Sequence, residues 1–544
     1  MENESSEDWT FDRTFLNLYQ GFPGAFGDPD GRRADLVDFV NVSELQHSTL
    51  FNPSSQRIRI VVGSKGSGKT FYLKRMKADL ESVRSSIRVV GEEQRLPIVD
   101  ETEATQLFST LHVLKVAHWF SGNVLTEVWQ QLWGRAIILS VVSHLLNNRT
   151  LRTHVEEDER KRLRSDFGTL IRSLRRDTRS PFTTARDLID RAHSGDEFIR
   201  GLDDPLWDDL EGRVAMLLQR TPPLYIFIDT VDEEFTSAPV YWLRCQKGLF
   251  YETMRLLRHA KIGSRLHVVI SVRDIVLYSI FRSEHGARYV GDPHVRVLAW
   301  NFDSARELLD AKIRRLRREF WQYEEQPTDL STWTGLHSVT SKVGRREDLY
   351  TYALRHTQKL PRDVVLFGNL LGRSVVEVRN ANRAFTEEDF REVVSNIARI
   401  SGLQHIEIVA NQIRADEVPA EATYYNFTES FLSIEEYADT RATQIIGILH
   451  ACKSLRINHT TYLELQQRGR SDLQAPDLAS ALWQAGLLGY QDRSTGADVF
   501  FAIDKLGRFT VPRDADEYVF HPSMREVAGL KPISTIWQAP APLS

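Results

Sequence analysis

Residues 57–83 read RIRIVVGSKGSGKTFYLKRMKADLESV, and this stretch decides the fold class. The apolar, β-branched run before Gly63 predicts a buried strand, and the residues after Thr70 predict a helix. Between them, Gly63 to Thr70 match the pattern G-x-x-x-x-G-K-[ST] at every position. A strand, a glycine-rich loop and a helix in this order predict an α/β phosphate-loop protein with a parallel sheet.

The loop itself is the predicted binding site for the phosphates of a nucleotide. Its glycines let the backbone curl so that successive N–H groups point into one concavity at the N-terminus of a helix. The Lys69 ammonium is expected to reach the β- and γ-phosphates, and the Thr70 hydroxyl is expected to ligate Mg²⁺. The predicted cofactors are therefore ATP and Mg²⁺, bound by Gly63, Ser64, Lys65, Gly66, Ser67, Gly68, Lys69 and Thr70.

A second apolar run, LYIFI at 224–228, continues into the acidic segment DTVDE. Ligands of open α/β sheets bind at the carboxyl ends of strands, so Asp229 is predicted to hold Mg²⁺. A group that polarises the attacking water is also required, and Thr230 has no carboxylate to supply it. That role falls to Asp232 or Glu233, of which Asp232 is favoured. The alternative interpretation is a solvated acidic turn.

Two arginines are candidates for contact with the γ-phosphate. The run LHVVISV ends at Arg273, which puts a guanidinium at the same edge of the sheet; a surface ion pair with Asp274 is the alternative. Arg362 follows Pro361, a residue preorganised for the first helical turn, and could project back over the nucleotide.

Further elements are expected around this core. LHVLKVAHWF (111–120) and VRVLAW (295–300) predict strands, and helical patterns occupy most of 124–220. Helices are also expected at about 303–323, 346–358, 362–372 and 386–400, the last opened by a Thr386–Asp389 capping box. Beyond Ser433, three helical segments and two strand-like segments, 487–492 and 517–522, predict a winged helix.

The predicted domains follow from these elements. They are a lead-in at 1–50 packed on the core, a P-loop ATPase core at 51–300 with a helical insertion at about 120–222, a helical lid at 301–400, a connector at 401–432, a winged helix at 433–530 and a flexible tail at 531–544.

Composition excludes several classes of protein. With 42% hydrophobic and 26% charged residues, the chain is neither disordered nor fibrous. A net charge of −5 on 544 residues argues against a chain-wide nucleic-acid or membrane surface. The acidic start does not resemble a secretory signal, and the apolar run Ala136–Leu146 is too short to cross a bilayer. Two distant cysteines frame no disulfide or zinc site, so a reducing, cytoplasmic location without a membrane partner is expected.

Taken together, VVGSKGSGKT, LYIFIDTVDE, VVISVRD, VRVLAWNFDSARELLDAKI and LPRDVVLFGN resemble the prokaryotic P-loop ATPases of the STAND and KAP families, relatives of the origin-recognition AAA+ proteins. The resemblance covers roughly residues 50–400. It implies Asp229 as the Mg²⁺ ligand, Asp232 or Glu233 for water activation, Arg273 as a sensor-1-like residue and Arg362 as a sensor-2-like residue. Thr230 stands where those families often have a small glycine.

The same resemblance implies a function. In such families ATP drives a closed-to-open or assembly switch among the core, the lid and the winged helix, and many prokaryotic members act in phage defence or handle DNA. We therefore expect an Mg²⁺-dependent ATPase that works as a molecular switch, with self-association or a separate effector protein as the readout. A small-molecule kinase is disfavoured by the chain length and by the acidic strand end at 229–233. An ABC-type ATPase is disfavoured because the sequence has no LSGGQ-like signature.

The main alternative is a DNA-loading ATPase that grips duplex DNA with its winged helix. Two stretches carry excess positive charge, 151–180 with nine Lys/Arg against six Asp/Glu and 306–318 with six against two, but acidic residues are interleaved in both. The predicted recognition helix, 477–485, has no Lys or Arg, which favours a latch that packs on the ATPase. Backbone contact remains open for the wing, which carries Arg493, Lys505, Arg508 and Arg513.

Overall fold

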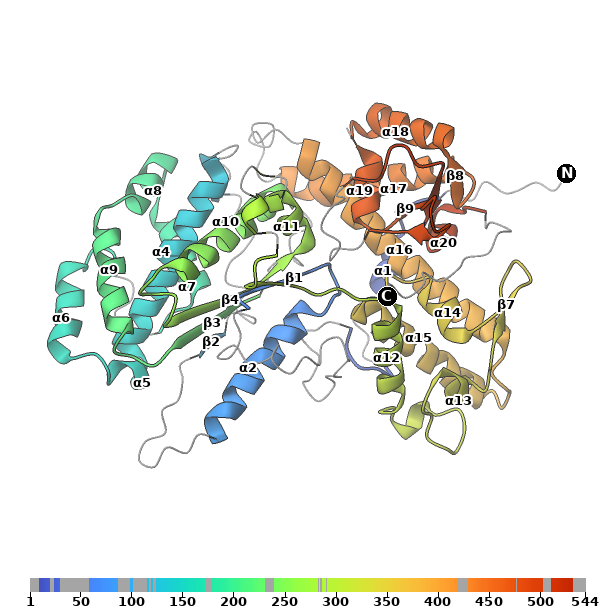
Figure 1. Ribbon diagram of the computed structural model, residues 1–544, viewed down its shortest axis with the longest axis horizontal. Helices are drawn as coiled ribbons and strands as arrows, with labels where there is room; N and C mark the ends of the chain where they lie inside the picture. The colour runs from blue at the N-terminus through green and yellow to red at the C-terminus, as the bar shows by residue number, and fades with distance from the viewer. Residues whose placement is uncertain are drawn as a thin grey trace.

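The protein is described from a computed structural model (Figure 1). Two halves lie side by side: a parallel sheet with covering helices, and a helical part that carries a small antiparallel sheet. We call residues 58–300 the sheet half and residues 301–531 the lid half. The described residues are 9–19, 24–29, 58–86, 98–100, 115–116, 119–120, 124–171, 178–229, 239–281, 283, 286–289, 291–417, 429–475, 477–501 and 510–531.

The central sheet has five parallel strands in the order β2-β3-β4-β1-β5. The predicted phosphate-loop strand, β1, lies between β4 and β5, and β4 separates it from β3, the strand that leads into Asp229. The fold class is therefore α/β with a parallel sheet, as predicted. The strands are β1 (Ile60–Gly63), β2 (Ile98–Asp100), β3 (Leu224–Ile228), β4 (Leu266–Arg273) and β5 (Val295–Val297).

Alternating side chains of the sheet enter two different hydrophobic clusters. Ile60, Ile226 and Ile270 belong to a large cluster shared with the helices of the insertion. Val61 and Phe227, one residue further along their strands, belong to a smaller cluster with α2 (Lys69–Ser86). Because both faces are covered, the strands are near-continuous apolar runs, as expected for a parallel sheet.

Between residues 124 and 220 the described chain consists mainly of helices, as the pattern predicted. Its longest helix, α4 (Val124–Asn147), is buried along most of its length and packs on α10 (Pro239–Arg258) and α7. The other helices here are α5 (Arg149–Arg152), α6 (Glu157–Asp166), α7 (Pro181–Arg191), α8 (Gly195–Leu202) and α9 (Leu206–Leu218). After β4, α11 (Asp274–Phe281) and a 3₁₀ turn (Gly286–Arg288) lead to β5.

The strand predicted at 111–120 is wrong for its described residues. Lys115, Val116 and Trp119 have helical backbone, and the Phe120 N–H donates to the Val116 carbonyl at 3.2 Å, as in a helical turn. The second edge strand is instead β2. A short apolar run does not distinguish a buried helix from a buried strand, so burial of Val116 explains the pattern equally well.

The lid half begins with five helices, and their lengths differ from the prediction. They are α12 (Phe302–Ile313), α13 (Leu330–Thr334), α14 (Leu349–Leu354), α15 (Pro361–Asn380) and α16 (Glu387–Glu417). Helix α12 ends ten residues before the predicted end at 323 and is followed by a 3₁₀ turn (Arg318–Phe320), whereas α16 extends beyond its predicted end at 400. Residues 346–347, predicted helical, form β7 (Arg346–Glu347), which pairs with β6 (Val339–Thr340). The Thr386–Asp389 capping box is confirmed, with reciprocal bonds of 2.9 and 3.3 Å.

Residues 429–531, which we call the C-terminal unit, contain the three helices and the hairpin that were predicted. The sheet order is β10-β9-β11-β8, and all its pairs are antiparallel. A helix, a strand, two helices and three strands follow one another before the short last helix, and this order contains the helix and hairpin order of a winged helix. The elements are α17 (Glu429–His450), β8 (Arg456–Asn458), α18 (His459–Leu473), α19 (Leu478–Gln484), β9 (Leu488–Gln491), β10 (Asp498–Val499), β11 (Glu517–Phe520) and α20 (Met524–Ala528).

One hydrophobic cluster runs through the lid helices and the C-terminal unit. The described part of the lead-in, with α1 (Arg13–Tyr19), joins this cluster through Phe11, Leu16 and Phe26. Its Arg13 also pairs with Glu407 and Asp439. We expected the lead-in to pack on the P-loop core, but its described residues pack on the lid half. Among the described helices, none is both long and apolar enough to cross a bilayer.

Candidate functional site

The glycine-rich loop lies where strand and helix meet at the carboxyl edge of the sheet. It follows β1, whose four residues are buried, and α2 begins at Lys69. Gly66 and Gly68 both have φ of +88°, a conformation that side chains with a Cβ rarely adopt. The Ser67 N–H donates to the Ser64 carbonyl at 3.2 Å, which closes a turn inside the loop. The two glycines thus supply the backbone curvature that the sequence pattern predicted.

Lys69 lies folded over this loop. Its side chain is buried, and the ammonium donates to the carbonyl oxygens of Gly63 at 3.0 Å and Ser64 at 3.1 Å. A buried ammonium requires such acceptors, because desolvation disfavours an isolated charge. This position keeps a positive charge at the mouth of the loop, where it can meet the phosphate oxygens of a nucleotide.

Asp229 is a buried carboxylate directly after β3. Its exposed fraction is only 2%, and its Oδ1 accepts a hydrogen bond from the Ser271 hydroxyl of β4. The register explains this contact, since Ile228 pairs with Ile270 and Ser271 is the next residue on β4. Ser271 also pairs with Val61 of β1, so this hydroxyl lies between the Asp229 strand and the phosphate-loop strand.

Arg273 is the last residue of β4 and lies beside the start of the glycine-rich loop, residues 63–70, which we call the phosphate loop. In the parallel register its partner on β1 is Gly63, the first residue of the loop. Its backbone N–H is within 3.5 Å of the Gln246 side-chain oxygen on α10. The structure thus brings Arg273 next to the loop, as the strand-end argument predicted.

The lid reaches the same loop through the first residues of α15. The Arg362 N–H donates to the Gly66 carbonyl at 3.2 Å. A Cβ placed on Gly66 would lie 3.0 Å from the Arg362 Cβ, and one on Gly68 would lie 3.8 Å from the Pro361 ring. Arg362 therefore lies directly against the phosphate loop, although in sequence it is almost 300 residues away.

The set of oxygen donors fits a magnesium ion. Thr70 is the second residue of α2, and Asp229 directly follows β3, which β4 separates from β1. Together they offer a hydroxyl and a carboxylate. The Ser67 hydroxyl, also buried in the loop, has no hydrogen-bond partner among the described residues. Among those residues no group of three or more His, Cys, Asp or Glu gathers at one point, as a dedicated all-protein metal site would need. Mg²⁺ usually takes few protein ligands and completes its shell with phosphate oxygens and water.

Two predicted residues cannot be placed. Asp232 and Glu233 lie outside the described residues, as does Thr230, so the assignment of the water-polarising group stays a prediction.

Sequence reasoning missed two side chains that contact the site. Trp300, just after β5, donates its indole N–H to the Ser67 carbonyl at 3.1 Å. Ser271 supports Asp229, as described above. A serine inside the apolar run LHVVISV was a usable signal, because a polar residue in a doubly covered strand needs a partner. Trp300 gave no such signal, since its role depends on β5 lying next to β1.

The C-terminal unit contacts the segment that immediately precedes Pro361. His521 Nε2 lies 3.2 Å from the Thr357 carbonyl, and the Gln358 amide is 3.4 Å from the Gly486 carbonyl. The Gln358 backbone N–H donates to Asp363 at 2.8 Å. Burial raises the pKa of Asp363 and lowers the pKa of His521 well below its usual value. A buried polar joint therefore connects the C-terminal unit to the start of α15.

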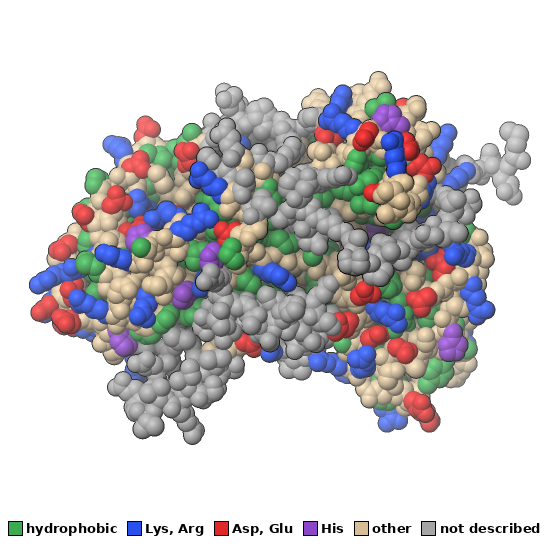
Figure 2. Space-filling model, viewed as in Figure 1, with side chains coloured by type: hydrophobic (Ala, Val, Ile, Leu, Met, Phe, Trp, Pro, Cys, Tyr) green, Lys and Arg blue, Asp and Glu red, His purple; other side chains and the backbone are tan. Residues whose placement is uncertain are grey.

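The geometry of the C-terminal unit offers little to a DNA duplex. All residues from Leu478 to Trp483 of α19, the helix in the recognition position, are buried, and α19 packs on α16. In the wing, Arg493 pairs with Asp516, while Lys505 and Arg508 lie outside the described residues. Figure 2 shows Lys/Arg and Asp/Glu side chains intermixed over the face in view.

The two basic stretches also have acidic partners. In the first, ion pairs join Arg160 to Glu157 and Lys161 to Asp158, and Arg213 of α9 pairs with Glu159. In the second, Arg317 pairs with Glu319. These contacts favour the interpretation of solvated helix faces.

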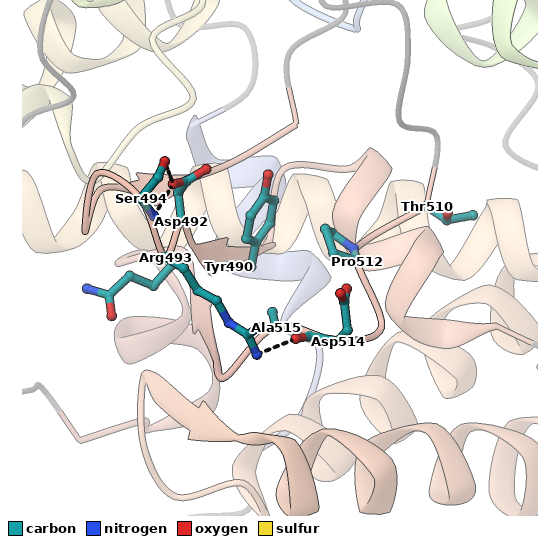
Figure 3. A pocket seen from close by; sticks show the side chains of 9 residues that line it. Tyr490, Asp492, Arg493, Ser494, Thr510, Pro512, Asp514 and Ala515 are labelled. Atoms are coloured by element: carbon teal, nitrogen blue, oxygen red, sulfur yellow. Dashed lines mark hydrogen bonds between the residues drawn. The ribbon is translucent and has the colours of Figure 1, made fainter.

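An open hollow of about 440 Å³ lies on the wing (Figure 3). Its polar lining groups bond to one another: Arg493 donates to the Asp514 carbonyl at 2.9 Å, and the Ser494 hydroxyl donates to Asp492. The Asp492 carboxylate also accepts the backbone N–H groups of Ser494 and Thr495. The hollow is therefore a feature of the hairpin turn, and we assign no chemistry to it.

No protein-family profile matches the chain, and no curated protein is similar to it in sequence. Among solved structures, the chain is similar to the ORC2 protein of Aeropyrum pernix, described as ADPNP-ADP complexes, with 12% identity over 96% of this chain and 97% of that chain. The TM-score is 0.27.

Proposed function

We propose that the protein binds ATP with Mg²⁺ at the phosphate loop and hydrolyses it to ADP and phosphate. The observation that carries this proposal is the loop between β1 and α2, with its two left-handed glycines, the buried Lys69 and the buried Asp229 on the next strand but one. Main-chain N–H groups and the Lys69 ammonium bind the phosphates, and Thr70 and Asp229 are the ligands for Mg²⁺. Bound there, the ion would offset negative charge on the phosphate oxygens.

The remaining roles follow from position. Arg273 and Arg362 approach the loop from β4 and from the lid, so both are suited to stabilise charge that develops at the γ-phosphate. Asp232 or Glu233 orients the attacking water, with Asp232 favoured.

The ATP state controls the angle between the two halves in this proposal. The lid helices and the C-terminal unit share one hydrophobic cluster and would move as one body. Among the described residues, the contacts that join this body to the sheet half include Arg362 on Gly66, Tyr278 against Phe501, and α10 against α16. Because one of them lies on the phosphate loop itself, a bound γ-phosphate can bias the closed against an open or assembled state.

The motif resemblance to STAND and KAP proteins suggests prokaryotic anti-phage defence as the setting of this switch. Self-association or a separate effector protein would be its readout. The DNA-loading alternative is disfavoured by the burial of α19 and by its lack of Lys and Arg.

The test compares the native protein with Lys69→Ala and with Lys77→Ala, a control that removes one positive charge from the same helix. Loss of a charged hydrogen-bond donor should weaken Mg²⁺-ATP binding roughly 10- to 100-fold in Lys69→Ala and leave Lys77→Ala unchanged. Titration calorimetry measures the binding of Mg²⁺-ATP, and released phosphate measures its hydrolysis. Particle mass with and without ATP measures self-association. Equal affinity in all three proteins would refute the site.

The same measurements with duplex DNA added distinguish the proposed switch from the DNA-loading alternative. Turnover that rises with duplex DNA and falls steeply with salt would support DNA loading instead, because phosphate contacts release counterions.

A further inference from the structure

Two adjacent peptide groups of the phosphate loop are held from outside the loop. The Gly66 carbonyl accepts the Arg362 N–H at 3.2 Å, and the Ser67 carbonyl accepts the Trp300 indole N–H at 3.1 Å. Within each planar trans peptide, the carbonyl and the N–H of the following residue point in opposite directions. Whatever holds a carbonyl in place therefore also fixes the direction of the next N–H.

This geometry accounts for the shape of the loop. With the Gly66 carbonyl directed toward Arg362, the Ser67 N–H points the other way and reaches the Ser64 carbonyl at 3.2 Å. With the Ser67 carbonyl directed toward Trp300, the Gly68 N–H is turned away from Trp300, at the N-terminal end of α2. We propose that Trp300 is a positioning residue that preorganises the amides of the phosphate loop for the nucleotide, an inference that rests on the proposed function.

Trp300 lies between two fixed points of the chain, Leu298 and Asn301. The Leu298 N–H donates to the Val62 carbonyl at 2.8 Å, which continues the pairing of β5 with β1. Asn301 caps α12, and its side chain accepts the Ser304 N–H at 2.9 Å. The indole ring between them packs against the hydrophobic cluster of the lid half. The direction of the indole N–H therefore depends on the strand pairing and on the seating of the lid.

The variant Trp300→Phe removes the N–H donor and keeps an aromatic ring in the same packing. Trp321→Phe is the matched control, because the Trp321 indole also donates to one backbone carbonyl, that of Leu316 at 3.0 Å, within the lid half. Both variants lose one indole hydrogen bond and should lose similar stability. Only the first loses a contact with the phosphate loop.

Three measurements are made on the full chain. Without nucleotide, hydrogen exchange of the peptide covering 63–70 should be faster in Trp300→Phe and unchanged in Trp321→Phe. With Mg²⁺-ATP, the Kd and the KM should rise about fivefold in Trp300→Phe alone, since a lost hydrogen bond changes an equilibrium by this order. The kcat should stay within about twofold of the native value, because Trp300 acts through the loop and touches no reacting atom.

The outcomes separate this inference from the proposed function. Equal loop exchange and equal Kd in the native protein and in Trp300→Phe overturn the inference and leave ATP binding intact. Equal effects of the two substitutions overturn it as well, because they show a general packing effect. A native protein that binds no ATP refutes the proposed function, and loop exchange in the absence of nucleotide then still decides whether Trp300 holds the loop. If Trp300→Phe fails to fold, Trp300→Tyr is measured in the same way.

Discussion

A hydrogen bond between two side chains, those of Ser271 and Asp229, supports the carboxylate that we propose as a ligand for Mg²⁺. Asp229 and Ser271 are both buried, and their hydrogen bond lies between β3 and β4. A buried carboxylate stays ionised only when donors or cations compensate its desolvation. The Ser271 hydroxyl is such a donor, and its hydrogen bond to Oδ1 orients the carboxylate that would face the ion.

We predict that Ser271→Ala weakens the magnesium dependence of ATP binding. Without the hydroxyl, the buried carboxylate loses a donor that orients it, and half-maximal ATP binding should require about three- to tenfold more Mg²⁺. Unfolding free energy should fall by about 1–2 kcal/mol, because a buried acceptor loses its donor. Titrating Mg²⁺ at fixed ATP measures the first effect, and urea unfolding measures the second.

Ser140→Ala is the control for this prediction. Ser140 is also fully buried and donates to the Arg179 carbonyl at 2.7 Å, but it lies on α4 in the insertion. It should lose comparable stability with no change in the Mg²⁺ requirement. A shift of the Mg²⁺ titration in both variants, or in neither, would contradict the role of Ser271.

At this scale, the sequence predicts residues whose roles depend on local order along the chain. The loop glycines and Lys69 belong to one short pattern, and Asp229 and Arg273 each end an apolar run. Trp300 could not be predicted, because its partner Ser67 is 233 residues away and becomes a neighbour only when β5 pairs with β1. The strand order, which no local pattern encodes, makes that contact.

At the scale of elements, α15 packs closely on the lead-in through its glycines. A Cβ on Gly368 would lie 2.0 Å from the Phe26 ring, and one on Gly372 would lie 2.4 Å from the Ala25 Cβ. Phe26 is also held by Asn369, whose side chain accepts the Phe26 N–H at 2.8 Å. The helix therefore needs glycine at 368 for close approach, despite the entropic cost of glycine within a helix.

We predict that Gly368→Ala destabilises the protein by about 1–3 kcal/mol, because the new methyl group overpacks against Phe26. Gly447→Ala on α17 is the matched control, since no atom lies within 4 Å of a Cβ placed there. It should stabilise the protein by about 0.5–1 kcal/mol through helix propensity alone. Urea unfolding of both variants checks the opposite signs. Two changes of the same sign would contradict the close packing of α15 on the lead-in.

The type of an element was predicted correctly where the hydrophobic periodicity agreed with the Gly, Pro and capping residues at its ends. The predicted boundary of a helix was wrong where tertiary contacts replace the hydrogen bonds of the helix. The expected helix to Tyr323 stops at Ile313, yet no Gly or Pro lies between them. After that point, Arg379 donates to the Trp321 carbonyl at 2.7 Å and to the Glu319 carbonyl at 2.9 Å. These partners from α15 satisfy the backbone of the segment, so a non-helical course is accommodated without any local stop signal.

At the scale of the whole molecule, histidines with lowered pKa values in several parts of the fold make its stability depend on pH. Burial lowers the pKa of His144 in the insertion and of His267 in the sheet to about 4, and that of His356 on the lid to about 3. It also lowers the pKa of His521 in the C-terminal unit well below 6.5. Each of these residues binds a proton more readily in the unfolded chain, whose histidines titrate near 6.5. Their contribution to stability is therefore fully present above pH 6.5 and is lost as the pH falls below it.

His521 is the residue that best isolates this effect, because it lies at the joint between the C-terminal unit and the segment before α15. Burial is the main cause of its lowered pKa, and the charges of Lys359, His405 and His356 lower it further, so a proton on its ring would be repelled. We predict that native stability falls steeply between pH 6.5 and pH 5, by about 1.4 kcal/mol per pH unit for each histidine that stays neutral in the fold. His521→Gln should lower that slope by up to about 1.4 kcal/mol per pH unit, although it also lowers stability at pH 7.

Urea unfolding at pH 7, 6 and 5 measures the slope for the native protein, for His521→Gln and for His337→Gln, a substitution at an exposed histidine of the lid half. The raised pKa of the buried Asp363 acts with the opposite sign, because the fold retains that proton as the pH rises. Since Asp363 is present in all three proteins, the difference between slopes reports mainly on His521. An unchanged slope in His521→Gln would show that the joint opens and admits the proton without unfolding, so the C-terminal unit would be held less tightly than its buried contacts with Thr357 indicate.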